Sequence, residues 1–139
     1  MPRVYLDACM VIHLVEGNSQ QQQVLKRALL GQKVFSSELV RLESRIKALR
    51  ENQSSFLKIY EQFFKDCQMI DLNRIVFGQA TDLRVIHNLK TPDALHLAAA
   101  LTANCDQFWT NDQQLVKAIN DKLQQSISVR DMADLEGML

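Results

Sequence analysis

The sequence predicts an α/β fold, a three-layer α/β/α sandwich around a central parallel sheet of four to five strands. Short apolar runs alternate along the chain with longer segments in which apolar residues recur at helical spacing. This alternation requires right-handed crossovers, and therefore a parallel sheet covered by helices on both faces. The 139 residues suffice for one buried core, so we expect a single domain spanning residues 1–139.

Strands are expected where short apolar runs are bounded by polar or turn-forming residues. The runs that fit are 4–6, 34–36, 69–72, 105–110 and 127–129. Helices are expected between them at 8–16, 19–30, 37–49, 52–66, 73–87, 91–101, from 111–115 onward and at 131–139. Ser19 is the expected cap of the second helix, while Gly17 and Gly31 are expected to end the first and second helices.

Three helices carry apolar stripes that we expect to face the core. The stripe of the helix at 37–49 is narrow and consists of Leu39, Leu42, Ile46 and Leu49. The stripe at 52–66 is mostly aromatic, which favours core and leaves a dimer or partner surface as the alternative; it consists of Phe56, Ile59, Tyr60, Phe63 and Phe64. The helix at 73–87 is expected to bury Ile75, Val76, Ala80, Leu83 and either Ile86 or His87.

The clearest helix start in the chain lies at 91–93. Thr91 is suited to the N-cap, and Pro92 to the first helical position because it needs no N–H partner there. Asp93 then falls in the first turn, where the helix dipole favours a negative charge. The apolar face behind it is formed by Ala94, Leu97, Ala98 and Leu101. Asp93 is therefore expected at the rim of a buried surface.

Further acids stand where strands end or a neighbouring helix begins. Asp7 directly follows the first strand and Asp112 closely follows the fourth, so both belong beyond the carboxyl ends of the strands, where open parallel sheets bind ligands. The start of the helix that carries Asp93 can face the same crevice. On the helix after the second strand, Glu38 and Glu43 border the apolar stripe on opposite sides, and geometry alone does not choose between them.

Carboxylates gathered in one cleft repel one another and raise each other's pKa values unless a cation is present. Oxygen ligands without a His or Cys cluster suit Mg²⁺ or Mn²⁺ better than structural zinc. Such an ion activates water and polarises a phosphodiester, while basic side chains hold the polyanion. The acids therefore indicate metal-assisted phosphoryl chemistry, with Arg41 and Arg45 as candidate contacts to the phosphates of the polyanion.

Charge and cysteine content restrict the function further. Sixteen basic and sixteen acidic residues give no net charge, so any nucleic-acid contact must come from a local patch. Cys9, Cys67 and Cys105 lack metal-binding or redox spacing and are expected to be reduced thiols, which favours a cytoplasmic location. We expect neither a cleavable leader nor a membrane-spanning segment.

Four stretches together resemble the PIN-domain family, and in particular its VapC-type ribonuclease toxins of type II toxin-antitoxin systems. They are Tyr-Leu-Asp-Ala at 5–8, the serine pair at 36–37 followed by Glu43, the stretch 91–100, and Phe-Trp-Thr-Asn-Asp at 108–112. The resemblance covers essentially the whole chain. It implies a PIN-like fold and an endoribonuclease that uses Mg²⁺ or Mn²⁺.

The resemblance also assigns the site residues and partners. It implies that the catalytic and metal-binding acids are Asp7, Glu43, Asp93 and Asp112, and so selects Glu43 over Glu38. It gives Thr110 and Asn111 supporting roles. The implied partners are an RNA substrate, a cognate antitoxin protein and a second copy of the chain.

One stretch departs from the family pattern, and both the role of His96 and the function of the chain have an alternative interpretation. Ala8 and Cys9 stand where the family usually carries Ser, Thr or Asn soon after the first aspartate, so polar support for Asp7 is expected to differ. His96 lies one turn after Asp93, close enough to contact it, and is expected to be a satisfied histidine rather than a metal ligand. The alternative function is a non-catalytic PIN-fold interaction or RNA-binding module, whose usual mark, the loss of an acid, is not seen.

Overall fold

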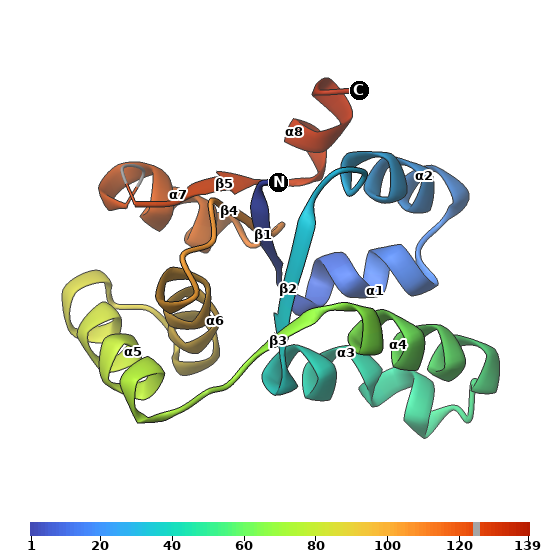
Figure 1. The fold of residues 1–139 in the computed structure, drawn as a ribbon, viewed down its shortest axis with the longest axis horizontal. Coiled ribbons are helices and arrows are strands. Elements are labelled where there is room, and N and C mark those ends of the chain that lie inside the picture. Colours follow the sequence, from blue (N-terminus) through green and yellow to red (C-terminus); the bar gives the residue numbers. More distant parts are fainter. Residues whose placement is uncertain (124–125) are drawn as a thin grey trace.

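The computed structural model describes residues 1–123 and 126–139, and it has the predicted three-layer α/β/α architecture (Figure 1). The strands are parallel and lie in the order β3-β2-β1-β4-β5. Along the chain they are β1 (Arg3–Leu6), β2 (Lys33–Ser37), β3 (Gln68–Ile70), β4 (Gln107–Trp109) and β5 (Ser128–Arg130). Each lies within a residue or two of a predicted run, and the sheet has the expected size.

The helices connect and cover these strands. They are α1 (Ala8–Glu16), α2 (Ser19–Ala28), α3 (Glu38–Arg50), α4 (Ser54–Asp66), α5 (Arg74–His87), α6 (Thr91–Thr102), α7 (Gln113–Lys122) and α8 (Met132–Gly137). In Figure 1, α1, α2 and α4 lie to the right of β1 and β2, and α5 and α6 lie to the left. No described helix is both long enough and apolar enough to cross a membrane.

The central strand β1 organises the sheet. Tyr5 is paired with Phe35 of β2 on one side and with Phe108 of β4 on the other. Val4, Tyr5 and Leu6 are fully buried, as a strand covered on both faces of a parallel sheet requires. The strand order reverses between β1 and β4, so the crevice beyond their carboxyl ends is the topological switch point of the fold.

Two predicted helix starts are wrong by one residue. Thr91 is the first residue of α6 rather than its cap, Lys90 is the N-cap, and no described side chain caps this helix. Pro92 is tolerated at the second position because the first N–H groups of a helix have no helical acceptor. The cap of α2 is Asn18 rather than Ser19, because Asn18 forms a reciprocal capping box with Gln21 that Ser19 is not placed to make.

The predicted inward face of α3 is also wrong. Leu42, Ile46 and Leu49 are 58%, 41% and 50% exposed, and the buried residues are instead Val40, Ser44 and Ala48. These three residues recur at a spacing of four, and their small side chains let α3 lie close to α1 and α6. Close backbone approach therefore decides the orientation of this helix over the larger apolar stripe.

Two other stripes are confirmed only in part. In α4 the rings of Tyr60 and Phe64 are buried, whereas Ile59 is half exposed. In α5 the residues Val76, Ala80 and Leu83 are buried, but Ile75 and Ile86 are mostly exposed. In both helices the neighbouring helices cover a narrower face than the apolar residues occupy, so part of each stripe remains on the surface.

The structure explains why glycine stands at position 17 but not why it stands at position 78. Gly17 ends α1 as predicted, but its backbone is extended, with φ −70° and ψ 174°, so no left-handed conformation requires it. A Cβ there would lie 2.3 Å from the His13 carbonyl oxygen and 2.7 Å from Gln21 Oε1. Gly78 lies within α5, and an added Cβ would meet no described neighbour within 4 Å. Close approach explains the first glycine only.

We therefore expect opposite effects of alanine at these positions. Gly17→Ala should lower the free energy of unfolding by about 1–3 kcal/mol because the backbone must move away from the new Cβ. Gly78→Ala should raise it by about 0.5–1 kcal/mol, since glycine is the poorer residue in a helix interior. Urea denaturation measures both. Stabilisation by Gly17→Ala would contradict the close packing of this residue against His13 and Gln21.

Candidate active site

Three of the predicted acids stand at the N-termini of three helices around the switch-point crevice. Asp7 is the N-cap of α1, and its carboxylate accepts the Met10 N–H at 3.3 Å. Asp112 is the N-cap of α7, and its Oδ1 accepts the N–H groups of the second and third residues of that helix. Asp93 lies in the first turn of α6. The positive ends of three helix dipoles therefore stabilise negative charge at one edge of the sheet.

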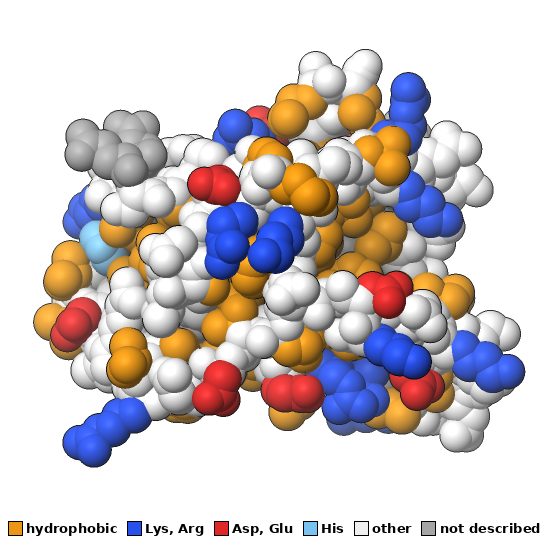
Figure 2. Space-filling view, in the orientation of Figure 1, with side chains coloured by type: hydrophobic (Ala, Val, Ile, Leu, Met, Phe, Trp, Pro, Cys, Tyr) orange, Lys and Arg blue, Asp and Glu red, His pale blue; other side chains and the backbone are white. Residues whose placement is uncertain are grey.

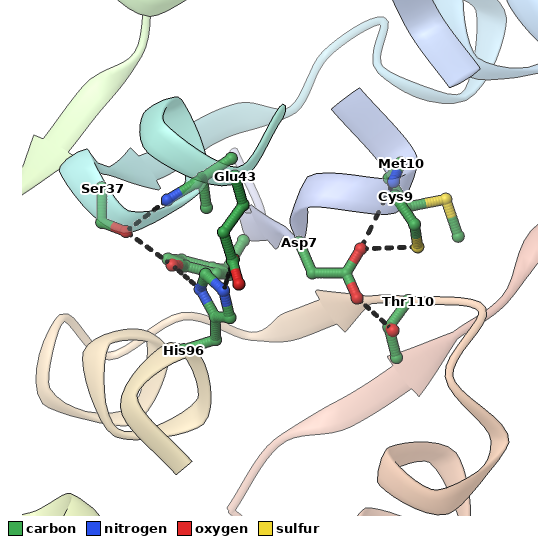
Figure 3. A network of polar contacts seen from close by, with 9 residues as sticks. Asp7, Cys9, Met10, Ser37, Glu43, His96 and Thr110 are labelled. Atoms are coloured by element: carbon green, nitrogen blue, oxygen red, sulfur yellow. Dashed lines mark hydrogen bonds and ion pairs between the residues drawn. The ribbon is translucent and has the colours of Figure 1, made fainter. Parts of the chain in front are cut away.

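Thr110 joins two of these acids. Its hydroxyl donates to Asp7 Oδ2 (Figure 3). The same oxygen accepts the backbone N–H of Asp112 at 3.0 Å. Thr110 directly follows β4 and is buried, so it has a fixed position between the ends of the two central strands. Thr110 thus lies where it was expected, holding Asp7 in one orientation relative to the start of α7.

Cys9 supplies the second contact to Asp7. Its thiol donates to Asp7 Oδ1 at 2.7 Å, and its sulfur lies 3.5 Å from the backbone N–H of Asn111. Burial raises the pKa of Cys9 to about 12, and the adjacent Asp7 carboxylate contributes, so the thiol stays protonated and remains a donor at neutral pH. In this chain a thiol two residues after Asp7 therefore supports its carboxylate.

Asn111 contacts one neighbour through its side chain and another through its backbone N–H. Its side-chain oxygen accepts the backbone N–H of Met132 at 2.9 Å, at the start of α8, while its backbone faces Cys9. The side chain therefore ties the loop after β4 to the C-terminal helix. Among the described contacts, Asn111 reaches Asp7 only through Cys9.

The electrostatics of Asp93 show that the aspartates influence one another. Burial raises the pKa of Asp93, and the nearby carboxylates of Asp112 and Asp7 raise it further, whereas Lys90 lowers it. Carboxylates that repel one another across a cleft favour a cation between them.

Glu43 is held on the other side of the site by a buried hydrogen-bonded chain. Its Oε1 lies 2.5 Å from Nε2 of His96. Nδ1 of the same ring lies 2.7 Å from the hydroxyl of Tyr5, which in turn lies 2.9 Å from Oγ of Ser37 (Figure 3). His96 is therefore a satisfied histidine, as expected, but its hydrogen-bond partners are Glu43 and Tyr5 rather than Asp93.

One arrangement of hydrogens satisfies this whole chain. The Val40 N–H donates to Ser37 Oγ, so the Ser37 hydroxyl is free to donate to Tyr5. Tyr5 then donates to Nδ1, and a neutral His96 donates its Nε2–H to Glu43. A protonated ring would reverse the chain and leave the buried Ser37 hydroxyl hydrogen without an acceptor among the described groups. Burial of Tyr5 raises its pKa, which keeps its hydroxyl a donor.

The donor set fits a hard divalent ion, although no ion-binding cage is preformed among the described residues. Within 1–123 and 126–139, no three His, Cys, Asp or Glu side chains converge closely enough to hold an ion directly. Mg²⁺ usually keeps several waters and takes only one or two protein carboxylates, so a closed cage is not required. The placement of Asp7, Asp93 and Asp112 at helix N-termini matches such an ion, and so does the direction in which Asp112 and Asp7 shift the pKa of Asp93.

Comparison with known families matches the PIN domain over residues 4–120. The chain belongs to the PIN domain family. Comparison with curated protein sequences gave no match.

Solved structures share the fold of this PIN domain. A toxin-antitoxin complex from Klebsiella pneumoniae aligns with a TM-score of 0.72 and 19% identity, over 93% of this chain and 97% of that one. VapBC-1 from nontypeable Haemophilus influenzae aligns with a TM-score of 0.70 and 14% identity, over 94% and 98%. VapBC2 from Rickettsia felis, bound to a promoter DNA fragment, aligns with a TM-score of 0.69 and 15% identity, over 93% of this chain and 98% of that one. At these identities the likeness establishes the fold.

The two predicted phosphate contacts of this PIN domain do not lie with the acids. Arg41 lies 3.4 Å from Glu38, and Arg45 donates to the Arg41 carbonyl oxygen at 2.9 Å. Each is two positions from Glu43 on α3, which places it about 200° around the helix axis from that residue. Glu38 acts as an acid in the first turn of α3, whereas the hydrogen bond to His96 directs Glu43 to the site.

Two cavities border different parts of this PIN domain. The larger, of about 730 Å³, is lined mainly by apolar residues of α1, α2, α4 and the neighbouring strands, and none of the predicted acids lines it. The second, of about 470 Å³, lies between α1 and α3 and includes Glu43 in its wall. Of the four predicted acids, Glu43 alone lines the second cavity.

Sequence reasoning missed Tyr5, Ser37 and Cys9 as parts of the site. Tyr5 has the pattern of a core residue of a strand, and its hydroxyl finds its partners only once β1 is packed against α6. Ser37 is half of a serine pair, which is a sequence signal for a cap but not for a partner of Tyr5. Cys9 had a signal that could have found it: it stands where the family carries a polar side chain.

We expect Tyr5→Phe to lower the free energy of unfolding by about 1–3 kcal/mol, because it leaves the buried Ser37 hydroxyl and His96 Nδ1 without their shared partner. Tyr60→Phe is the matched control: it also removes one hydroxyl from a buried ring, but the partner Glu16 is only partly buried and can turn to water. Urea denaturation compares the two. A cost no larger for Tyr5→Phe than for Tyr60→Phe would contradict the buried chain from Ser37 to His96.

Proposed function

We propose that this chain is a Mg²⁺- or Mn²⁺-dependent endoribonuclease and the toxin of a toxin-antitoxin pair. The observation that carries the proposal is the placement of Asp7, Asp93 and Asp112 at three helix N-termini around one crevice, with a raised pKa of Asp93 caused in part by the other two. Membership of the PIN domain family supports nuclease chemistry. The VapBC and toxin-antitoxin complexes among the structural neighbours support the biological role.

The side chains have distinct tasks in this proposal. Asp7, Asp93 and Asp112 would hold the ion, directly or through water, with Glu43 on the facing side of the crevice. When bound, the ion would supply an activated water and stabilise charge on the phosphodiester. Thr110 and Cys9 fix the Asp7 carboxylate, and His96 fixes Glu43, so little reorganisation is needed when substrate arrives.

The proposed partners are RNA, a cognate antitoxin and a second copy of the chain, all in the cytoplasm. The antitoxin follows from the complexes formed by the structural neighbours. The cavity of about 730 Å³ offers it an apolar groove away from the acids. A homodimer would cover exposed apolar side chains on α5, which are Ile75, Phe77, Val85 and Ile86.

The function is tested by cleavage of a short labelled single-stranded RNA and of total RNA with Mn²⁺ or Mg²⁺ present. Asp7→Asn and Glu43→Gln should each reduce the cleavage rate by about 100-fold or more, since each removes a negative charge that would hold the ion at the site. Glu38→Gln is the matched control on the same helix and should retain activity, because Glu38 contacts Arg41 and is exposed.

Chelation should abolish cleavage by the wild type, and added Mn²⁺ should restore it. Equal loss of activity in Glu38→Gln and Glu43→Gln would contradict the choice of Glu43 over Glu38 as an acid of the active site. A wild type that binds RNA but cuts neither substrate with either ion would favour the alternative, a non-catalytic PIN-fold interaction or RNA-binding module.

The ion site is tested without activity through thermal unfolding. Mn²⁺ at 100 times its Kd should stabilise the wild type by about 2.7 kcal/mol through binding to the folded state. Asp93→Asn should lose most of that response. Asp82→Asn on the exposed side of α5 is the matched control and should respond like the wild type. Identical responses of the wild type and Asp93→Asn would exclude Asp93 as a ligand.

Without metal, in the presence of chelator, the stabilities of the wild type and Asp93→Asn should depend differently on pH. Because the folded-state pKa of Asp93 is raised, its ionised form disfavours folding at neutral pH, and stability is gained as pH falls through that raised pKa. Asp93→Asn should therefore have a higher Tm than the wild type at pH 7. The difference should shrink as pH approaches the unfolded-state value of about 4. A lower Tm for Asp93→Asn at pH 7 would contradict the repulsion.

A further inference from the structure

The cavity that Glu43 lines has walls from two helices. Ile12 and Glu16 of α1 form one wall, and α3 supplies the other through Glu43, Ser44, Ile46, Lys47, Arg50 and Glu51. At about 470 Å³ it is large enough for a small-molecule group such as a nucleotide. Since Glu43 belongs both to this cavity and to the acid site, a chain bound at the site can continue directly into the cavity.

Helix geometry places two basic side chains on the same face as Glu43. Lys47 follows Glu43 by four residues and Arg50 by seven, so both project from that face, about 6 Å and 10 Å further along the axis. Both are exposed, and neither forms an ion pair with any described residue. In contrast, Arg41 and Arg45 contact their own helix on its other side.

The acids that share the cavity are mostly engaged elsewhere. Glu43 is hydrogen-bonded to His96, and Glu16 accepts the hydroxyl of Tyr60. Glu51 is exposed just beyond the end of α3. Figure 2 shows basic, acidic and apolar side chains interspersed in the area of α3 and α4, so the basic character of this area is local to particular side chains.

A buried polar atom supports a ligand in the same place. Ser44 lines the cavity and is 1% exposed, yet its hydroxyl has no hydrogen-bond partner among the described residues. Buried hydroxyls are nearly always paired, because an unpaired one loses the hydrogen bonds that water would otherwise make with it. The apolar walls of Ile12 and Ile46 complete a site with a donor, two cations and a surface for a base or ribose.

We propose that the cavity between α1 and α3 is an RNA subsite, in which Lys47 and Arg50 bind phosphates next to the scissile one and Ser44 donates a hydrogen bond to the bound nucleotide. The inference rests on the proposed ribonuclease function and specifies the surface of α3 to which the substrate binds. RNA then leaves the acids along the Glu43 face of α3, away from Arg41 and Arg45.

The test is binding of a short fluorescent oligouridylate in chelator, measured by anisotropy over a range of salt concentrations. Each phosphate contact in single-stranded nucleic acid contributes about 0.7 to the slope of log K against log salt. Lys47→Gln and Arg50→Gln should each reduce the slope by about 0.7, and the double variant by about 1.4. Ser44→Ala should weaken binding by about twofold to tenfold without changing the slope.

Arg41→Gln and Arg45→Gln are the matched controls, because they remove the same charge from the other side of α3 and should leave the slope unchanged. A reduced slope in these controls, with a full slope in Lys47→Gln and Arg50→Gln, would overturn the inference and move the RNA to the opposite side of the helix. A wild type that cleaves RNA while both cavity variants keep the full slope would overturn the subsite alone. A wild type that neither binds nor cleaves RNA would overturn the proposed function as well.

Discussion

The buried carboxylate of Asp7 is the constraint on which the rest of the site depends. It follows the strand that pairs with both β2 and β4, so its backbone cannot shift without disturbing the centre of the sheet. A buried charge is costly unless it is hydrogen-bonded, and Thr110, Cys9 and the Met10 N–H satisfy this one. Two of these donors come from the start of α1, and the third comes from the end of β4. One carboxylate thereby fixes the relative position of the two strands that flank the switch point.

The positions of the acids could be predicted from the sequence because they follow from topology. An aspartate directly after a buried strand and another after a later strand must meet at one edge of a parallel sheet, whatever the details of packing. Asp7 and Asp112 are such residues, and Asp93 lies in the first turn of its helix as expected, although the N-cap of that helix is one position earlier than predicted. Local rules were sufficient for these three aspartates because each stands at a helix N-terminus, where sequence signals are strongest.

The partners of these acids could not be predicted, because they depend on which face of each helix is buried. The leucine and isoleucine residues of α3 predicted one face, and close packing of Val40, Ser44 and Ala48 selected another. That rotation decides what surrounds Glu43: His96 on the inner side, and Lys47 and Arg50 along the same outer face. Tyr5 likewise became a site residue only because its hydroxyl meets a histidine from a helix far away in sequence.

The absence of net charge has a consequence for how such a site would recognise RNA. A chain with sixteen basic and sixteen acidic residues has no overall field to concentrate a polyanion, and the gathered aspartates repel it. Attraction must therefore come from charges within a Debye length of the crevice, a distance of about 8 Å at physiological salt. Lys47 and Arg50 lie within or close to that range of Glu43 along α3, and a divalent ion among the aspartates would add the remaining positive charge. Affinity would then depend on the ion and on α3 together, so that RNA is held where the carboxylates have been neutralised.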